Sequence, residues 1–129
     1  HLMDIPMGYV RSSAKDHGRT NQIEGKLLPG QKVVVVEDLI STAGSAVDTV
    51  KVLREAGADV LGIASIFTYG MKKGLERLAE NNVKNVSLCN LDALVDVAAA
   101  SGYIKEEDKA KILTFRDNPS DEGWMKGAK

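Results

Sequence analysis

The pattern of hydrophobic residues changes its period several times along the chain. Residues 33–36 and 60–67 form short apolar runs, which are typical of strands, whereas Val47, Val50 and Leu53 recur at the spacing of one helix face. Strands that alternate with helices favour a largely parallel sheet with helices packed on it. We therefore predict an α/β fold built on a mostly parallel sheet.

The same criteria assign the rest of the chain. Residues 5–10 and 23–28 are expected to be short strands, the second in a hairpin. The four valines at 33–36 indicate a strand buried on both faces of the sheet. Residues 83–88 are expected to be a further strand, with Cys89 buried beside it. Three more helices are expected: one with Leu75, Leu78 and Ala79 on its inner face, one with Leu91, Leu94, Val95 and Ala98 on one face, and one over residues 106–115.

The ends of these helices carry their own signals. Asn90 or Asp92 can accept hydrogen bonds from the amides of a first helical turn. Gly57 and Gly102 follow expected helices at positions where glycine commonly ends them. The helix after residues 33–36 is therefore expected to run from a loop of small residues at 41–45 to Gly57.

Composition and charge limit the class of protein. The chain has 129 residues, 43% apolar and 27% charged, with a formal net charge of −1. This balance suits one soluble domain over residues 1–116, followed by a mobile tail at 117–129 with Trp124 as its candidate anchor. The low net charge gives no general attraction to nucleic acid or to a membrane, so a small-molecule ligand is expected.

Two features that the sequence lacks limit the cellular location and the kind of cross-link or metal site that can be expected. It contains no apolar run of roughly 20 residues and no secretion signal at its start, so a cytoplasmic location is expected. Its single cysteine allows neither an internal disulfide nor a metal site built from several thiolates.

The segment VVVVEDLISTAGS, residues 33–45, contains the strongest chemical signal. It places two carboxylates at the carboxyl end of a buried strand, where ligands of open α/β sheets bind, and a loop of small residues directly after them. The loop's backbone amides, the hydroxyls of Ser41, Thr42 and Ser45, and the start of the next helix can surround a phosphate. Ala43 and Gly44 leave room for the backbone to approach it. The segment lacks the lysine of a Walker A loop and the glycine spacing of a dinucleotide fingerprint.

The two acids before the loop form the second part of this candidate site, next to the predicted phosphate-binding loop. Glu37 and Asp38 can accept hydrogen bonds from vicinal hydroxyls and can attract magnesium, which prefers oxygen ligands and keeps phosphates in its shell. A ribose 5-phosphate fits both halves.

Residues 11–22 have a different character. Arg11, Lys15, His17 and Arg19 gather there against the single acid Asp16, and no apolar period is present. Such a basic, mobile loop can close over a diphosphate, neutralise the charge of a departing group and exclude water. We interpret it as a catalytic loop.

The segment VVVVEDLISTAGS resembles the thirteen-residue signature of the type I phosphoribosyltransferases. The resemblance implies their Rossmann-like α/β fold, and the match begins partway into the family's sequence, so we expect the fold to be incomplete at its N-terminus. It also implies that Glu37 and Asp38 bind the ribose hydroxyls of 5-phospho-α-D-ribose 1-diphosphate (PRPP), with magnesium carried by PRPP near these acids. The whole stretch implied to bind PRPP is Glu37, Asp38, Leu39, Ile40, Ser41, Thr42, Ala43, Gly44 and Ser45.

The basic loop, with Arg, three residues, Lys, one residue and His-Gly, followed by Asn-Gln-Ile-Glu-Gly, is similar to the catalytic loop of the orotate phosphoribosyltransferases. This implies that Arg11, Lys15 and His17 are catalytic and bind the diphosphate, acting in the partner's site of a homodimer. It also places Ser41 next to orotate. The chain departs from the pattern at Ser12, where many members have a second basic residue. It departs again at Tyr69, which stands where some members have an arginine over the orotate ring and which we expect to offer a weaker face.

The resemblance implies a pentosyltransferase that transfers phosphoribosyl from PRPP to orotate, giving orotidine 5-phosphate and diphosphate in UMP biosynthesis. Because the family's N-terminal segment and its diphosphate-binding loop are expected to be missing, the chain alone should keep the ribose phosphate contacts and lack part of the orotate site. Two alternatives stay open. One is transfer to another base, and the other is a non-catalytic regulator that senses PRPP, although the sequence shows no DNA-binding segment.

Overall fold

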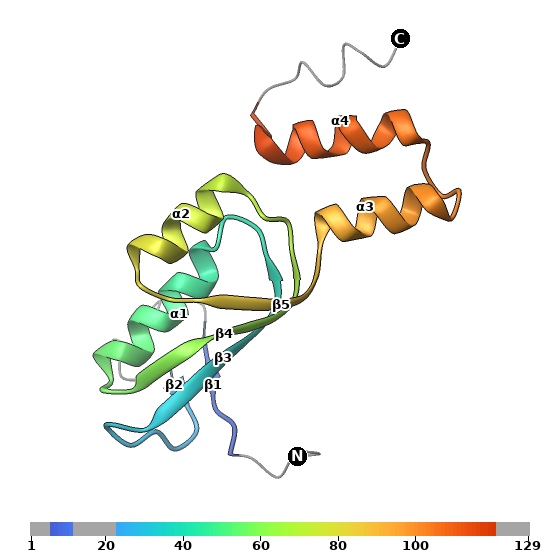
Figure 1. The fold of residues 1–129 in the computed structure, drawn as a ribbon. Helices are drawn as coiled ribbons and strands as arrows, with labels where there is room; N and C mark the ends of the chain where they lie inside the picture. Colours follow the sequence, from blue (N-terminus) through green and yellow to red (C-terminus); the bar gives the residue numbers. More distant parts are fainter. Residues whose placement is uncertain (1–5, 12–22, 121–129) are drawn as a thin grey trace.

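Three parallel strands, with two helices on one of their faces, form the centre of the molecule (Figure 1). The computed structural model describes residues 6–11 and 23–120 of the chain. Figure 1 shows α1 and α2 together on one side of the sheet, and α3 and α4 as a hairpin beyond the end of β5. The elements are β1 (Tyr9–Val10), β2 (Ile23–Glu24), β3 (Lys32–Ile40), α1 (Gly44–Glu55), β4 (Asp59–Thr68), α2 (Lys72–Glu80), β5 (Asn85–Asn90), α3 (Leu91–Ala100) and α4 (Glu106–Asp117).

The main sheet has the strand order β3-β4-β5, and both pairs are parallel. The helices α1 and α2 connect successive strands, as parallel neighbours require. The predicted α/β fold with a mostly parallel sheet is therefore confirmed. The predicted hairpin is also present, because β1 pairs antiparallel with β2, but each of these strands has only two residues.

The core lies between the sheet and α1. Val47, Val50 and Leu53 are buried, as their spacing predicts, and they belong to one cluster with Val35 of β3 and Ile63 of β4. The helix stops where glycine was expected, since Gly57 has a φ of 92°, a conformation that other residues rarely adopt. At the start of α3, the Asn90 side chain accepts a hydrogen bond from the Ala93 amide at 2.8 Å, which confirms the predicted cap.

The other face of the sheet is open in the described part of the chain. Val34, Val36, Ile66 and Leu88 are 53%, 79%, 58% and 87% exposed. The prediction of a strand buried on both faces is therefore wrong for residues 33–36. Side chains alternate between the two faces of a strand, and α1 and α2 cover only one of them.

Three smaller expectations also need correction. Leu75 is 58% exposed because the buried stripe of α2 consists of Gly74 and Leu78, one turn apart. Ala79 is exposed for the same reason. Cys89 is only half-buried, since β5 is an edge strand of the described sheet.

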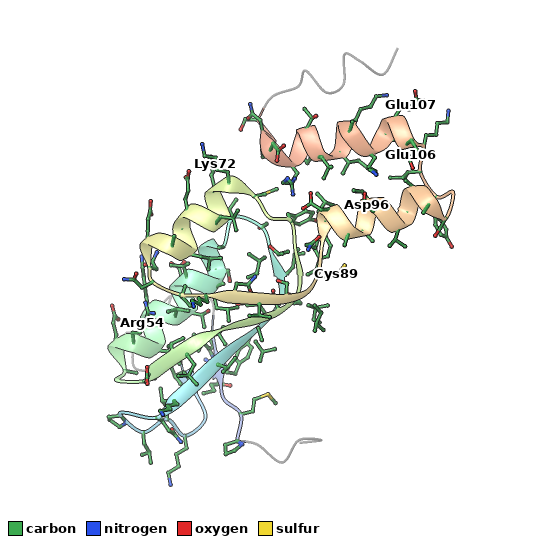
Figure 2. The ribbon with its side chains drawn as sticks, in the orientation of Figure 1. Arg54, Lys72, Cys89, Asp96, Glu106 and Glu107 are labelled. Atoms are coloured by element: carbon green, nitrogen blue, oxygen red, sulfur yellow. The ribbon has the colours of Figure 1, made fainter. Side chains whose placement is uncertain are left out.

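The C-terminal hairpin is fastened by ion pairs. Lys109 of α4 lies 2.8 Å from the Asp96 carboxylate of α3, and Figure 2 shows Asp96 between the two helices. The helix α4 runs to Asp117, two residues beyond the end of the helix expected at 106–115. Trp124 lies outside the described residues. Within the described ranges, α1–α4 are each too short or too polar to cross a lipid bilayer.

Candidate functional site

Residues 41–45, which we call the hydroxyl loop, comprise the connection after β3 and the first two residues of α1, because the helix begins at Gly44, earlier than the sequence predicted. Ala43 is buried and has a φ of 63°, a left-handed conformation that costs energy for a residue with a Cβ and that is concentrated at functional sites. No side chain caps α1, and its first turn contains no acid. The amides at this helix end are therefore placed to attract an anion.

The helix α2 supports the hydroxyl loop from one side. Gly74 is buried, and a Cβ at that position would lie 2.5 Å from the Ser41 carbonyl oxygen. Arg77 donates a hydrogen bond from Nη1 to the Thr42 carbonyl at 3.0 Å, and the same nitrogen would be 2.9 Å from a Cβ on Gly44. Arg77 thus brings a positive charge to the loop. Sequence reasoning missed both α2 residues, although a glycine inside a helix is a sign of close backbone approach.

The two acids lie within β3, with Leu39 and Ile40 still paired to β4 beyond them. The strand is therefore longer than its valine run predicted. Glu37 is half-buried on the face that the helices cover, whereas Asp38 is exposed. Burial raises the pKa of Glu37, and the neighbouring charge of Asp38 raises it further. The two carboxylates thus have different environments, and their ribose contacts stay a prediction.

A row of polar side chains continues from Glu37 across the covered face of the sheet. Glu37 pairs in register with Ser65, and Ser65 pairs with Ser87. The Ser65 and Ser87 hydroxyls are hydrogen-bonded, and the Asn85 side chain accepts from Ser65 and donates to Ser87, at 2.9 Å in each case. This network could not be predicted from the sequence, because its members come from two strands whose register is a tertiary feature.

A pocket of about 580 Å³ opens beside the hydroxyl loop. Ile40 at the end of β3 and Ser41 of the hydroxyl loop line it on one side. Thr68 at the end of β4, and Gly70 and Met71 before α2, also line it. That Ser41 lies next to orotate stays a prediction. Tyr69 is half-buried, and its ring makes an edge-to-face contact with Phe67, with ring centroids 5.2 Å apart.

Of the predicted catalytic loop, the structure describes only Arg11. Arg11 forms an ion pair with Glu24 across the β1–β2 hairpin, and both side chains are about half exposed. Exposed pairs of this kind contribute roughly 0–1 kcal/mol, so Arg11 can be released from Glu24 at little cost. Lys15 and His17 lie outside the described residues, as does Ser12.

The described residues do not by themselves form a closed metal site. Among them, no group of three or more histidine, cysteine or acidic side chains comes together. Glu37 and Asp38 offer carboxylate oxygens of the kind that magnesium prefers, but they can supply only part of its shell. An ion in this region would need oxygens from a bound phosphate compound and water.

The chain is similar in sequence to known phosphoribosyltransferases. Residues 1–103 match the family model described as "Phosphoribosyl transferase domain". The chain is 57% identical over 123 residues to the orotate phosphoribosyltransferase of Bacillus cereus (strain G9842), and 56% identical over 125 residues to that of Listeria innocua. These alignments cover 95% and 97% of the chain but 59% of each relative, so the chain spans about three fifths of the length of the curated relatives it matches.

Solved structures agree. Leishmania donovani UMP synthase superposes with a TM-score of 0.74 at 25% identity, over 88% of this chain and 24% of that one. Mycobacterium tuberculosis orotate phosphoribosyltransferase, solved in complex with PRPP, superposes with a TM-score of 0.55 at 30% identity, over 67% of this chain and 48% of that one. The expected phosphoribosyltransferase fold is thus confirmed.

Proposed function

Because this chain belongs to the phosphoribosyl transferase family, we propose that the protein transfers the phosphoribosyl group of PRPP to N1 of orotate, releasing diphosphate. The observation that carries the proposal is the hydroxyl loop, which lies at the uncapped start of α1 directly after Glu37 and Asp38. The relatives at 56–57% identity, named orotate phosphoribosyltransferases, support the choice of orotate.

The hydroxyl loop would bind the 5-phosphate. The amides of the first turn of α1 donate toward an anion, and Arg77 adds a positive charge on the loop's α2 side. Glu37 and Asp38 would accept hydrogen bonds from the ribose hydroxyls, which fixes the orientation of the anomeric carbon. The pocket that Ser41 and Gly70 help to line would then place the base on one side of that carbon.

The chemistry consists of one displacement at the anomeric carbon. The bond from this carbon to the diphosphate oxygen breaks, and a bond to N1 of orotate forms. We propose that Arg11, Lys15 and His17 stabilise the negative charge that grows on the departing diphosphate. Magnesium, bound mainly through the phosphates of PRPP, would supply further charge neutralisation there.

The proposal includes a homodimer, in which the basic loop at residues 11–22 acts in the partner's site, and a cytoplasmic location. The hydrogen-bonding groups seen around the hydroxyl loop belong to one chain, whereas the leaving-group contacts would come from the other. Arg11 is compatible with this role because its exposed pair with Glu24 is easily exchanged for a phosphate.

Turnover of PRPP with different bases tests the proposal. In the full-length protein with magnesium, we expect orotidine 5-phosphate from orotate and no product from adenine, xanthine or uracil. Thr42→Val should weaken PRPP binding, because it removes a hydroxyl from the loop. Thr114→Val, the same change on exposed α4, is the matched control and should have no effect.

Product formation with another base but not with orotate would reassign the substrate. Tight PRPP binding without turnover of any base, combined with retardation of DNA in a shift assay, would instead show a PRPP-sensing regulator.

A further inference from the structure

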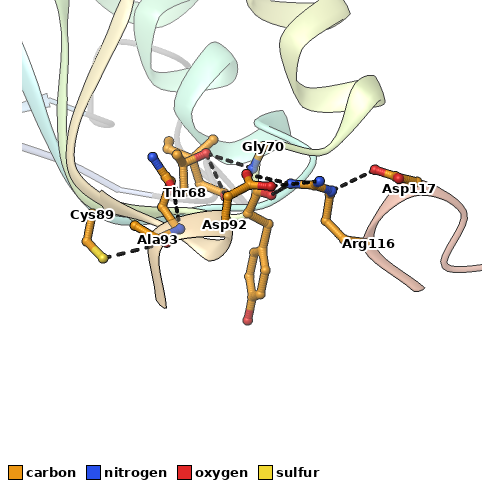
Figure 3. Close-up of polar contacts among 10 residues, drawn as sticks. Thr68, Gly70, Cys89, Asp92, Ala93, Arg116 and Asp117 are labelled. Carbon is orange, nitrogen blue, oxygen red and sulfur yellow. Dashed lines mark hydrogen bonds and ion pairs between the residues drawn. The ribbon is translucent and has the colours of Figure 1, made fainter. Parts of the chain in front are cut away.

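Arg116, near the end of α4, joins three segments that are distant in the sequence (Figure 3). Its Nη1 donates to the Tyr69 carbonyl at 3.0 Å and to Oδ2 of Asp92 at 3.0 Å, and its Nη2 donates to Oδ1 of Asp92 at 3.2 Å. Its Nε donates to Asp117 at 2.7 Å. One guanidinium therefore connects α4, the first turn of α3 and the segment after β4.

The segment after β4 is fixed from two sides. The Tyr69 amide donates to the Ile40 carbonyl at 3.0 Å, at the end of β3, while its carbonyl accepts from Arg116. The Gly70 amide donates to the Thr68 hydroxyl at 3.2 Å. Gly70 has a φ of 67°, and a Cβ there would lie 3.3 Å from Nη1 of Arg116, so the backbone turns immediately under the guanidinium.

Arg116 is more buried than its charged neighbours on α4. Its side chain is 12% exposed, compared with 31% for Lys109 and 69% for Asp117. The hydrogen bonds from Arg116 lower the pKa of Asp92. The hydrogen bonds that Arg116 makes with Asp92 and Asp117 raise the pKa of Arg116, so the guanidinium stays charged. A planar guanidinium can bind both oxygens of one carboxylate and still reach a carbonyl, which a lysine ammonium cannot do with the same geometry.

Thr68 at the end of β4, with Gly70 and Met71 of the fixed segment, lines the same pocket as Ser41, and we call these three residues the pocket wall. The family match ends at residue 103, so Arg116 lies beyond it. A residue beyond that family model thus donates a hydrogen bond to the backbone that borders the pocket. A purely structural clamp between α3 and α4 would need only the Asp92 contact, and the additional bond to the Tyr69 carbonyl is what connects the helices to the pocket.

We propose that Arg116 is a positioning residue for the acceptor base, because its bond to the Tyr69 carbonyl holds the backbone of the pocket wall in place beside Ser41. The inference rests on the proposed function for the identity of the base. It assigns to the α3–α4 hairpin a role in base binding, and it leaves PRPP binding to the hydroxyl loop and the acids of β3.

The test compares Arg116→Ala with Lys109→Ala in the full-length protein. Lys109 is the matched control, because it also joins α4 to α3, through Asp96, but makes no contact with the pocket wall among the described interactions. Arg116→Ala should raise the KM for orotate by about tenfold or more, since misplacing a binding group by an ångström can cost up to about 100-fold. The Kd for PRPP should not change. Arg116→Lys should restore part of the loss, and Lys109→Ala should leave both constants unchanged.

An unchanged KM for orotate in Arg116→Ala, or an equal rise in Lys109→Ala, would overturn the inference. A second measurement tests the positioning role of Arg116 independently of the proposed function. Hydrogen exchange of the Tyr69, Gly70 and Met71 amides should be faster in Arg116→Ala and unaltered in Lys109→Ala. If the wild-type protein does not use orotate, the proposed function fails, and equal exchange in the two variants would then also reject the positioning role.

Discussion

Gly74 of α2 packs directly against the carbonyl oxygen of Ser41, with no room for a side chain between them. A Cβ on Gly74 would lie 2.5 Å from that oxygen, a distance that such atoms do not adopt without movement of the backbone. Gly74 is also buried together with Leu78, so α2 cannot move outward without loss of core contacts. The position of the hydroxyl loop is therefore determined partly by a helix that follows it by some thirty residues in the sequence.

Replacing Gly74 with alanine tests this relationship, because two effects predict opposite signs. In an ordinary helix interior, Gly→Ala stabilises by about 1 kcal/mol. Here the clash with a backbone oxygen should cost roughly 1–3 kcal/mol and should displace Ser41. We expect a lower free energy of unfolding in urea and weaker binding of inorganic phosphate by calorimetry. Lys73→Ala, an exposed change in the same turn, is the control. A stabilised Gly74→Ala protein with unchanged phosphate affinity would contradict this account.

Arg77 provides a second test of the hydroxyl loop. Arg77→Ala removes both the bond to the Thr42 carbonyl and the positive charge beside the loop, so phosphate affinity should fall by roughly tenfold, as expected for one charge-assisted contact. Arg54→Ala is the matched control, since Arg54 also donates from a helix to backbone carbonyls, those of Asn81 and Asn82, but away from the loop. Calorimetric titration at two salt concentrations measures both variants, and equal losses in the two would show a general effect on stability.

Glu37 should titrate above the ordinary value of 4.5, because burial and then the charge of Asp38 raise its pKa. A carboxyl whose pKa is raised by folding binds its proton more tightly in the folded state. Its contribution to stability is therefore present at low pH and is lost as the pH rises from about 4.5 through the raised pKa. Carbon-13 NMR of the Glu37 carboxyl measures this shift. Asp38→Asn should lower the pKa only in part, since burial is the larger cause, and a return to 4.5 in that variant would contradict this order of causes.

Features that depend on local periodicity could be predicted from the sequence. The inner face of α1, the cap at Asn90 and the stop at Gly57 were all confirmed, because each depends on residues within a few positions of one another. The hydroxyl loop was found for the same reason, since its small residues and the acids before it are contiguous.

Features that depend on packing between distant segments could not be predicted. A run of valines indicates a strand, but whether Val36 is buried depends on a layer elsewhere in the chain, and the described part has none on that face. Arg116 lies 47 residues from Tyr69, and in the sequence it is one more charged residue near the end of a polar helix. The roles of Lys15 and His17 stay predictions for a different reason, because they lie outside the described residues.

The proposed action of the basic loop across a dimer predicts complementation between two inactive variants. In the full-length protein, Lys15→Ala should reduce turnover on the order of 100- to 1000-fold, with a smaller effect on PRPP binding, because an ammonium beside the departing diphosphate acts mainly once charge has developed. Asp38→Ala should weaken the ribose contacts and therefore PRPP binding itself.

If the loop acts in the partner's site, a mixed dimer contains one site with both Lys15 and Asp38 intact. Random mixing makes about half of the dimers mixed, so activity should return to about a quarter of that of the wild-type protein. Either variant mixed with itself is the control and should stay inactive. Mixed dimers, verified by two different affinity tags, that remain as inactive as their parents would show that Lys15 acts within its own subunit. A fall in PRPP affinity as large as the fall in turnover for Lys15→Ala would remove the leaving-group role as well.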